Sequence, residues 1–149
     1  MKQVLFLCTG NYYRSRFAER LFNALAGPAR LGWQAASRGL HPSPANIGPL
    51  SPDAASELAR RGIAPEAAPR FPLQLQESDL RQADLIIALN EAEHRPLLQA
   101  RFPGWEARAH YWHIPDLGEA PASRALPEAE REVRALVQRL LDGRAPSGS

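Results

Sequence analysis

The sequence predicts a single α/β domain with a mostly parallel four-stranded sheet and helices on both of its faces. Short, continuous apolar runs are typical of strands that are buried on both sides of a parallel sheet, and they alternate here with amphipathic stretches of helical spacing. The length of 149 residues is that of one ordinary domain. We find neither an internal repeat nor a second domain, so we assign residues 1–144 to the domain and residues 145–149 to a loose tail.

Four segments are expected to form the strands of this sheet. Two of them are continuous apolar runs that suit central, buried strands, and the other two are shorter candidates. In chain order the four expected strands are Val4–Leu7, Trp33–Ser37, Ala83–Leu89 and Ala109–Ile114.

The helices are predicted from apolar periodicity and from capping residues. The first contains Phe17, Leu21 and Leu25, spaced four apart, and Gly27-Pro28 ends it. A second helix is expected to open at Ser51-Pro52, where serine caps and proline takes the first helical position.

Two more helices follow later in the chain. Asn90, with Glu93 three residues on, indicates a helix start after the third strand. The last helix is expected to open at Pro127-Glu128 and to close at Gly143, with an apolar stripe between them.

Composition excludes several classes of function. The chain carries 18 Lys and Arg against 16 Asp and Glu, and its arginines stand beside glutamates in helical segments. This pattern favours solvated helix faces over a nucleic-acid surface, and no apolar run is long enough to span a bilayer. A single cysteine cannot form an intramolecular disulfide, so we expect a reducing, cytoplasmic location. The four histidines show no metal-binding spacing, and we expect neither a metal nor an organic cofactor.

The segment Cys8–Ser15 joins the first strand to the first helix and has the composition of an anion-binding loop. In such a turn the backbone N–H groups point inward, and the following helix adds the positive end of its dipole. Gly10 permits close backbone approach, and Asn11 tolerates left-handed geometry. Arg14 presents a planar fork that matches two phosphate oxygens.

The same loop supplies a nucleophile. A thiol in a positive field has its pKa lowered from roughly 8.5, so Cys8 is expected to be a thiolate at neutral pH. Ser15 is expected to hydrogen-bond the sulfur and to stabilise it as a leaving group. These residues predict cleavage of phosphate monoesters.

The loop pattern resembles that of the low-molecular-weight protein tyrosine phosphatases, and the resemblance extends over nearly the whole chain. The family's loop reads Cys-x-Gly-Asn-x-x-Arg-Ser, and the matching residues here are Cys8, Gly10, Asn11, Arg14 and Ser15. The resemblance implies hydrolysis of phosphotyrosine or related aryl phosphates through a cysteinyl-phosphate intermediate. It assigns catalysis to Cys8, Arg14 and Asp116 and substrate binding to Thr9, Gly10, Asn11, Tyr12, Tyr13 and Ser15.

The resemblance also implies support for the loop from outside it. Ser37 stands where the family has a serine that braces the loop asparagine. A histidine that braces the loop in many members is replaced near Ala68, which leaves Ser37 to hold Asn11 without it. The family's frequent second cysteine is Tyr13 in this chain.

The predicted general acid lies on a late loop. The family's acid stands in Asp-Pro, whereas here Asp116 is followed by Leu117, and the tyrosines that often follow are missing. Tyr12 is expected at the rim of the pocket, and Tyr13 either at the rim or packed beneath the loop. The expected partner is a phosphorylated protein or a small aryl phosphate.

Two other functions stay open on sequence grounds. One is an arsenate reductase of the same fold, but its thioredoxin-linked form needs further cysteines, which this chain lacks. The other is a catalytically weak phosphate-binding module, which Leu117 keeps possible.

Overall fold

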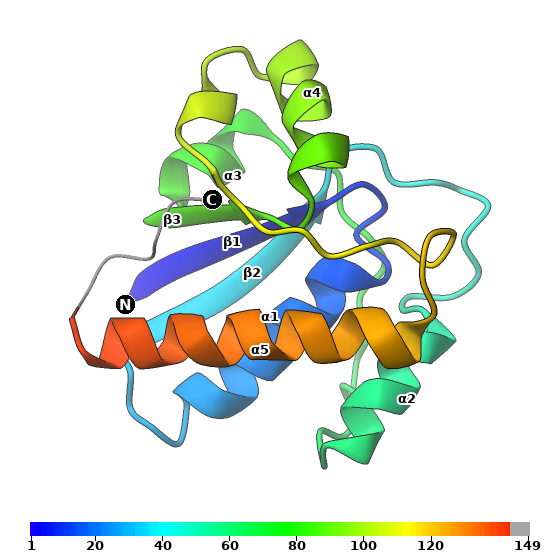
Figure 1. Ribbon diagram of the computed structural model, residues 1–149, viewed down its shortest axis with the longest axis vertical. Coiled ribbons are helices and arrows are strands. Elements are labelled where there is room, and N and C mark those ends of the chain that lie inside the picture. The colour runs from blue at the N-terminus through cyan, green and yellow to red at the C-terminus, as the bar shows by residue number, and fades with distance from the viewer. Residues whose placement is uncertain (144–149) are drawn as a thin grey trace.

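The computed structural model describes residues 1–143, so the predicted tail at residues 145–149 lies outside the described residues. Its strands and helices alternate along the chain (Figure 1). The elements are β1 (Lys2–Cys8), α1 (Arg14–Ala26), β2 (Trp33–Gly39), α2 (Pro52–Arg60), α3 (Glu77–Gln82), β3 (Leu85–Ala88), α4 (Glu91–Arg101), the 3₁₀ turn η1 (Trp105–Ala107), β4 (His110–Tyr111) and α5 (Ala122–Leu141).

The four strands form one parallel sheet in the order β2-β1-β3-β4. In Figure 1, α1 and α5 lie on one side of this sheet and α3 and α4 on the other. The alternation of side chains along β1 produces two cores: Val4 and Phe6 face α1 and α5, whereas Leu5 and Leu7 face α3 and α4. The predicted fold class is therefore confirmed.

The strand order reverses at β1. The chain runs from β1 to β2 on one side, and β3 then pairs with β1 on the other side. In open parallel sheets this reversal leaves a crevice beyond the carboxyl ends of the two central strands. Cys8 ends β1 and Asn90 follows β3, so the segments after both strands meet at this crevice.

Two predicted caps are found in the structure. The Ser51 hydroxyl accepts the N–H of Ala54, 3.4 Å away, at the start of α2. The Asn90 side chain accepts the N–H of Glu93, 3.2 Å away, at the start of α4. Each side chain satisfies a donor that the first helical turn leaves without a partner.

The predicted start of the last helix is wrong. α5 begins at Ala122, and Pro127 lies inside the helix. Ala125 and Leu126 precede the proline and are fully buried, and Ala129 continues the same buried face. The burial of this extra turn offsets the backbone hydrogen bond that the proline removes.

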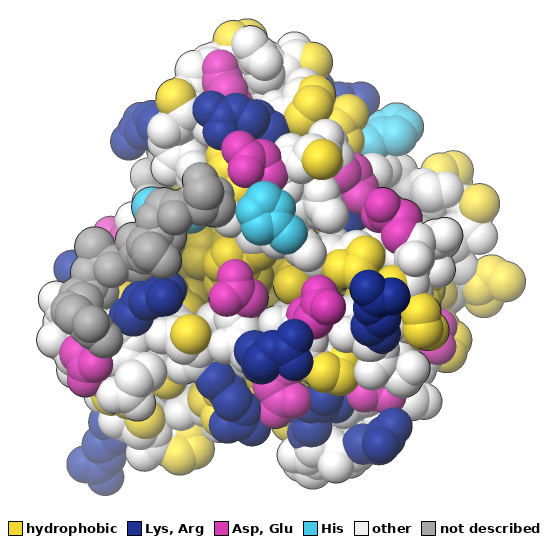
Figure 2. All heavy atoms as spheres, viewed as in Figure 1, with side chains coloured by type: hydrophobic (Ala, Val, Ile, Leu, Met, Phe, Trp, Pro, Cys, Tyr) yellow, Lys and Arg dark blue, Asp and Glu magenta, His cyan; other side chains and the backbone are white. Residues whose placement is uncertain are grey.

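Two other elements differ from expectation. Helix α3 was not predicted, because it has only six residues and buries only Leu80, although Gln76 and Asp79 form a capping box around its start. β4 is shorter than expected, since only His110 and Tyr111 pair with β3. None of the helices in the described part of the chain is long and apolar enough to cross a membrane. On the face drawn in Figure 2, basic and acidic side chains are interspersed.

Candidate active site

A pocket of about 330 Å³ opens at the crevice beyond β1 and β3. This volume is within the range of small-molecule sites. The pocket is lined by Cys8, Thr9, Gly10, Tyr12, Tyr13, Arg14, His41, Ser43, Asn46, Asp116 and Leu117. The structure thus brings the three predicted catalytic residues to one pocket, together with four residues of the predicted binding loop.

Cys8 lies at the base of this pocket and is only 3% exposed. Its sulfur is 2.9 Å from the hydroxyl oxygen of Ser15. The same hydroxyl oxygen accepts a hydrogen bond of 2.9 Å from the Asn11 side-chain amide. Because this oxygen already accepts, the hydroxyl hydrogen is free to point at the sulfur.

Asn11 adopts a left-handed backbone conformation with φ of 50°. Its side chain is buried and does not line the pocket. The amide nitrogen donates to Ser15 and to Ser37, each at 2.9 Å, while the amide oxygen accepts the backbone N–H of Leu73 at 3.0 Å. Asn11 therefore braces the loop, and Ser37 contacts it as expected.

Arg70 is a brace that the sequence analysis missed. Its guanidinium donates to the amide oxygen of Asn11 at 2.9 Å and to the hydroxyl of Ser37 at 3.0 Å, and it pairs with Glu19 at 3.2 Å. Ser37 was expected to hold Asn11 without the family's histidine, and in the structure Arg70 contacts both residues in addition. No spacing could have revealed the contact, because Arg70 comes from a proline-rich loop and 59 residues separate it from Asn11.

The side chain of Arg14 is buried and held on two sides. One terminal nitrogen donates to the carbonyl of Ile114 at 3.0 Å, and the other donates to the carboxylate of Glu93 at 2.7 Å. Burial opposes the charged form, but the hydrogen bond that Arg14 donates to Glu93 and the neighbouring charge of Cys8 raise the pKa of Arg14 above its usual value. A guanidinium has five N–H donors, so a phosphoryl group can still be bound by the others.

Glu93 is the second residue that the sequence analysis missed. One of its carboxylate oxygens accepts from Arg14 and, at 2.5 Å, from the Thr9 hydroxyl. The Nε2 atom of His94 lies 3.1 Å from the same oxygen, although outside hydrogen-bond geometry. Burial alone would raise the pKa of Glu93, but His94, Arg14 and Thr9 hold it well below its ordinary value. The capping pattern at Asn90 explained Glu93 fully, so nothing in the sequence pointed to Arg14.

His94 is buried and neutral. Its Nδ1 accepts the backbone N–H of Asn90 at 3.0 Å, so the ring proton is on Nε2, facing Glu93. Burial lowers the pKa of His94, while Glu93 acts in the opposite direction. Among residues 1–143 no group of three or more His, Cys, Asp or Glu side chains could hold a metal ion.

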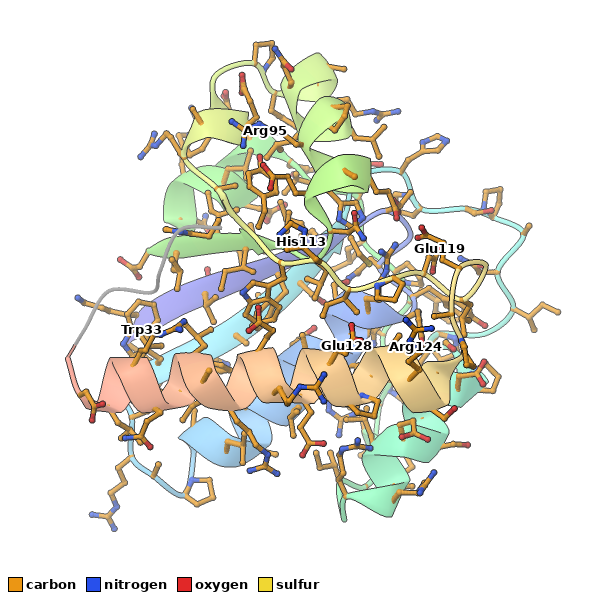
Figure 3. All side chains as sticks on the ribbon, in the orientation of Figure 1. Trp33, Arg95, His113, Glu119, Arg124 and Glu128 are labelled. Carbon is orange, nitrogen blue, oxygen red and sulfur yellow. The ribbon has the colours of Figure 1, made fainter. Side chains whose placement is uncertain are left out.

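Asp116 lies on the loop after β4, at the edge of the pocket. Its carboxylate is 3.8 Å from Arg14, and its side chain is 51% exposed. The backbone N–H groups of Glu119 and Ala120 donate to the carbonyl of Asp116, and this turn orients the loop without the proline that Leu117 replaces. Figure 3 shows Glu119 on this loop, ahead of the start of α5.

The two loop tyrosines have different surroundings. Tyr12 is half-buried at the rim, and its hydroxyl donates to the carbonyl of Ile47. Tyr13 is 5% exposed and packs into the core, and its buried hydroxyl has no hydrogen-bond partner among the described residues. Burial and the charges of Asp53 and Asp116 raise the pKa of Tyr13 to about 12.

Comparison with known proteins identifies the family. The model of the low molecular weight phosphotyrosine protein phosphatases matches residues 3–142. The chain belongs to this family. This confirms the recognised resemblance and the prediction of a phosphatase at the level of the family, and it does not favour the arsenate reductase alternative.

Relatives of the chain act as protein phosphatases. The chain is 31% identical over 99 residues to a protein-arginine-phosphatase of Bacillus subtilis, and the match spans 66% of this chain and 62% of that relative. It is 26% identical to the low molecular weight protein tyrosine phosphatase from T. tengcongensis, with a TM-score of 0.75 and coverage of 96% and 99% of the two chains. The fold is also that of Vibrio vulnificus Wzb in complex with benzylphosphonate, with a TM-score of 0.77, 18% identity and coverage of 93% and 98%.

Proposed function

We propose that this chain hydrolyses aryl phosphate monoesters, including phosphotyrosine in proteins, through a cysteinyl-phosphate intermediate on Cys8. One observation carries the proposal: the sulfur of Cys8 lies at the base of a pocket that Arg14 and Asp116 also line. This arrangement supplies a nucleophile, a cation for the phosphoryl oxygens and a group for proton transfer.

In the first step the thiolate of Cys8 attacks phosphorus and the bond from phosphorus to the ester oxygen breaks. Asp116 gives its proton to that oxygen, so the alcohol leaves neutral. Arg14, together with the loop N–H groups, binds the phosphoryl oxygens as charge spreads over them.

In the second step a water molecule attacks the phosphorus, and the Asp116 carboxylate takes one of its protons. The phosphorus–sulfur bond breaks, phosphate is released and the Cys8 thiolate is restored. The Ser15 hydroxyl, 2.9 Å from the sulfur, supports the sulfur as it leaves with negative charge. Cytoplasmic placement belongs to this proposal, because the single cysteine works only in its reduced form.

Phosphoarginine is a second candidate substrate, on the ground that a relative at 31% identity is a protein-arginine-phosphatase. The same cysteine chemistry would then break a phosphorus–nitrogen bond, and Asp116 would protonate the departing nitrogen. The leaving group differs, whereas the phosphoryl pocket is shared.

Phosphate release from matched peptides tests both candidates. The peptides carry phosphotyrosine, phosphoarginine or phosphoserine at one position, and 4-nitrophenyl phosphate serves as an activated reference. We expect turnover of the phosphotyrosine peptide and of the reference, inhibition by vanadate, and loss of turnover in Cys8→Ser. Turnover of the phosphoarginine peptide alone would favour the second candidate. Retained turnover in Cys8→Ser would exclude the cysteinyl-phosphate, and absence of turnover on all substrates would leave only a phosphate-binding module.

A further inference from the structure

Glu93 places a fixed negative charge next to the phosphate-binding arginine. One of its carboxylate oxygens accepts a hydrogen bond from Arg14 at 2.7 Å and another from the Thr9 hydroxyl at 2.5 Å. Thr9 belongs to the phosphate loop itself, so this carboxylate contacts the pocket wall from outside, on helix α4. It does not line the pocket and is not part of the chemistry described above.

This carboxylate is locked in place. Thr9 and Arg14 both donate to a single oxygen of it, and the Nε2 atom of His94 lies 3.1 Å from the same oxygen without hydrogen-bond geometry. The backbone N–H of Glu93 is also bound, by the Asn90 cap at 3.2 Å. A ligand that enters the pocket therefore binds Arg14 while Glu93 stays beside it.

A phosphoryl dianion in the pocket is attracted by Arg14 and repelled by Glu93, because the two charged groups are adjacent. The Asp116 carboxylate, 3.8 Å from Arg14, adds a second acidic group, but it is half exposed and can be screened by water. Glu93 is the better shielded of the two, with a side chain that is 28% exposed. Its repulsion is felt alike by substrate and by product phosphate, since both carry the same phosphoryl oxygens.

We propose that Glu93 is an affinity-setting residue of the pocket, which weakens the binding of phosphoryl dianions through Arg14 and so favours release of inorganic phosphate. The inference rests on the proposed function, because it gives product release a role. The competing role for Glu93 is mere orientation of Arg14. The two roles predict opposite changes in the affinity for phosphate. Loss of repulsion tightens phosphate binding, whereas loss of orientation weakens it.

Glu93→Gln separates these roles. The glutamine oxygen can accept from Arg14 and Thr9 as the carboxylate does, so the variant removes charge and keeps the contacts. Glu91→Gln is the matched control, because Glu91 lies in the same first turn of α4 but pairs with Arg95 at 3.1 Å, on the exposed surface. It reports any general effect of a lost acidic charge at the helix start.

The primary measurement is calorimetric titration of inorganic phosphate into each variant in the Cys8→Ser background, which needs no turnover. We expect the Kd of phosphate to fall roughly tenfold in Glu93→Gln and to be unchanged in Glu91→Gln. With Cys8 present, KM for 4-nitrophenyl phosphate and Ki for phosphate should fall together while kcat does not rise, the signature of binding shared by ground and transition states.

An unchanged or higher Kd in Glu93→Gln overturns the proposal. Glu93→Ala serves as a second variant should the glutamine variant not fold: we expect tighter phosphate binding than in the wild type, whereas weaker binding in Glu93→Ala would assign Glu93 to orientation alone. Because the titration is independent of turnover, it remains decisive even if the proposed phosphatase activity fails.

Discussion

The sulfur of Cys8 and the hydroxyl oxygen of Ser15 lie 2.9 Å apart in the buried base of the pocket. Asn11 donates to that hydroxyl oxygen at 2.9 Å, which leaves the hydrogen of the Ser15 hydroxyl available to the sulfur. Ser15 is thereby built to stabilise negative charge on Cys8, both before attack and when the phosphorus–sulfur bond breaks.

Ser15→Ala should slow hydrolysis of the cysteinyl-phosphate more than it slows formation of that intermediate. A hydrogen bond to a charged group contributes about 1.5–3 kcal/mol, which corresponds to a loss in kcat of about 10- to 100-fold. Rapid-mixing kinetics with 4-nitrophenyl phosphate should show a larger burst followed by a slower steady state. Ser78→Ala, at an exposed position on α3, is the control. A steady-state rate equal to that of the wild type would show that the contact is not used in catalysis.

Asp116→Asn should lower turnover most for substrates with poor leaving groups. Loss of a general acid costs ~10²–10⁴ in rate, and an activated aryl ester needs that acid least. The measurement is kcat for a series of aryl phosphates of increasing leaving-group pKa. Glu119→Gln is the comparison, because the Glu119 carboxylate accepts the N–H of Asp116 at 3.3 Å on the same loop. A steeper dependence in Glu119→Gln than in Asp116→Asn would move the acid to Glu119.

Arg70→Met should reduce kcat/KM although Arg70 does not line the pocket. The variant removes the contacts with Asn11, Ser37 and Glu19 that hold the left-handed turn of the loop. We expect kcat/KM to fall about tenfold or more. The value for Arg70→Lys should lie between those of the wild type and Arg70→Met, because an ammonium keeps the charge but lacks the planar fork. Arg20→Met is the matched control, because Arg20 donates to the carbonyl of Ala64 at 2.6 Å at the other end of the same loop. Equal losses in both arginine variants would point to loss of loop stability instead of loss of the brace.

Tyr13→Phe should stabilise the fold by about 1 kcal/mol, since it removes a buried hydroxyl that has no described partner. The matched variant Tyr12→Phe loses the bond to the Ile47 carbonyl and should not stabilise. With a folded pKa of about 12 against the ordinary 10, Tyr13 keeps its proton longer in the folded state. This contribution to stability is complete below pH 10 and is lost as the pH rises toward 12.

Denaturant unfolding between pH 7 and pH 11 measures both effects. The wild type should lose stability above pH 10 more steeply than Tyr13→Phe does. If Tyr13→Phe is destabilised at pH 7, the hydroxyl has a partner that the structure does not describe, such as a bound water.

Peroxide should inactivate the enzyme without forming an intramolecular disulfide. Cys8 is the only cysteine in the chain, and Tyr13 occupies the nearby loop position where a second thiol could have trapped a sulfenic acid. Intact-mass spectrometry should show gains of one and then two oxygens, and the second should coincide with loss of recovery by reductant. Bound phosphate should protect Cys8. Full recovery after long exposure, with no gain beyond one oxygen, would contradict this expectation.

The phosphate loop and the order of strands and helices could be read from the sequence because both depend on local patterns. Cys8, Asn11, Arg14 and Ser15 lie within eight residues, and their chemistry is set by a turn between a strand and a helix. Short apolar runs located the strands, and helical periodicity together with capping residues located four of the α-helices, for the same reason.

The features that could not be predicted from the sequence depend on contacts between distant segments. Arg70 and Glu93 are 59 and 79 residues from the loop residues they bind, and the capping pattern at Asn90 already explained Glu93. The start of α5 was predicted wrongly, because the burial of the turn ahead of Pro127 outweighs the backbone hydrogen bond that the proline removes. Sequence patterns reveal neighbours along the chain, whereas these effects come from neighbours in space.

The left-handed turn at Asn11 bears on whether this pocket could be grafted onto another protein. Its geometry is supported by Ser37 on β2 and by Leu73 and Arg70 on a proline-rich loop. Gly39 on β2 also matters, because a Cβ there would come within 2.9 Å of the Thr9 carbonyl. A transplanted Cys8–Ser15 octapeptide would carry the reactive groups but not these supports. A minimal transferable unit would therefore include the end of β2 and the segment around residues 70–73, and design should begin from that three-part unit.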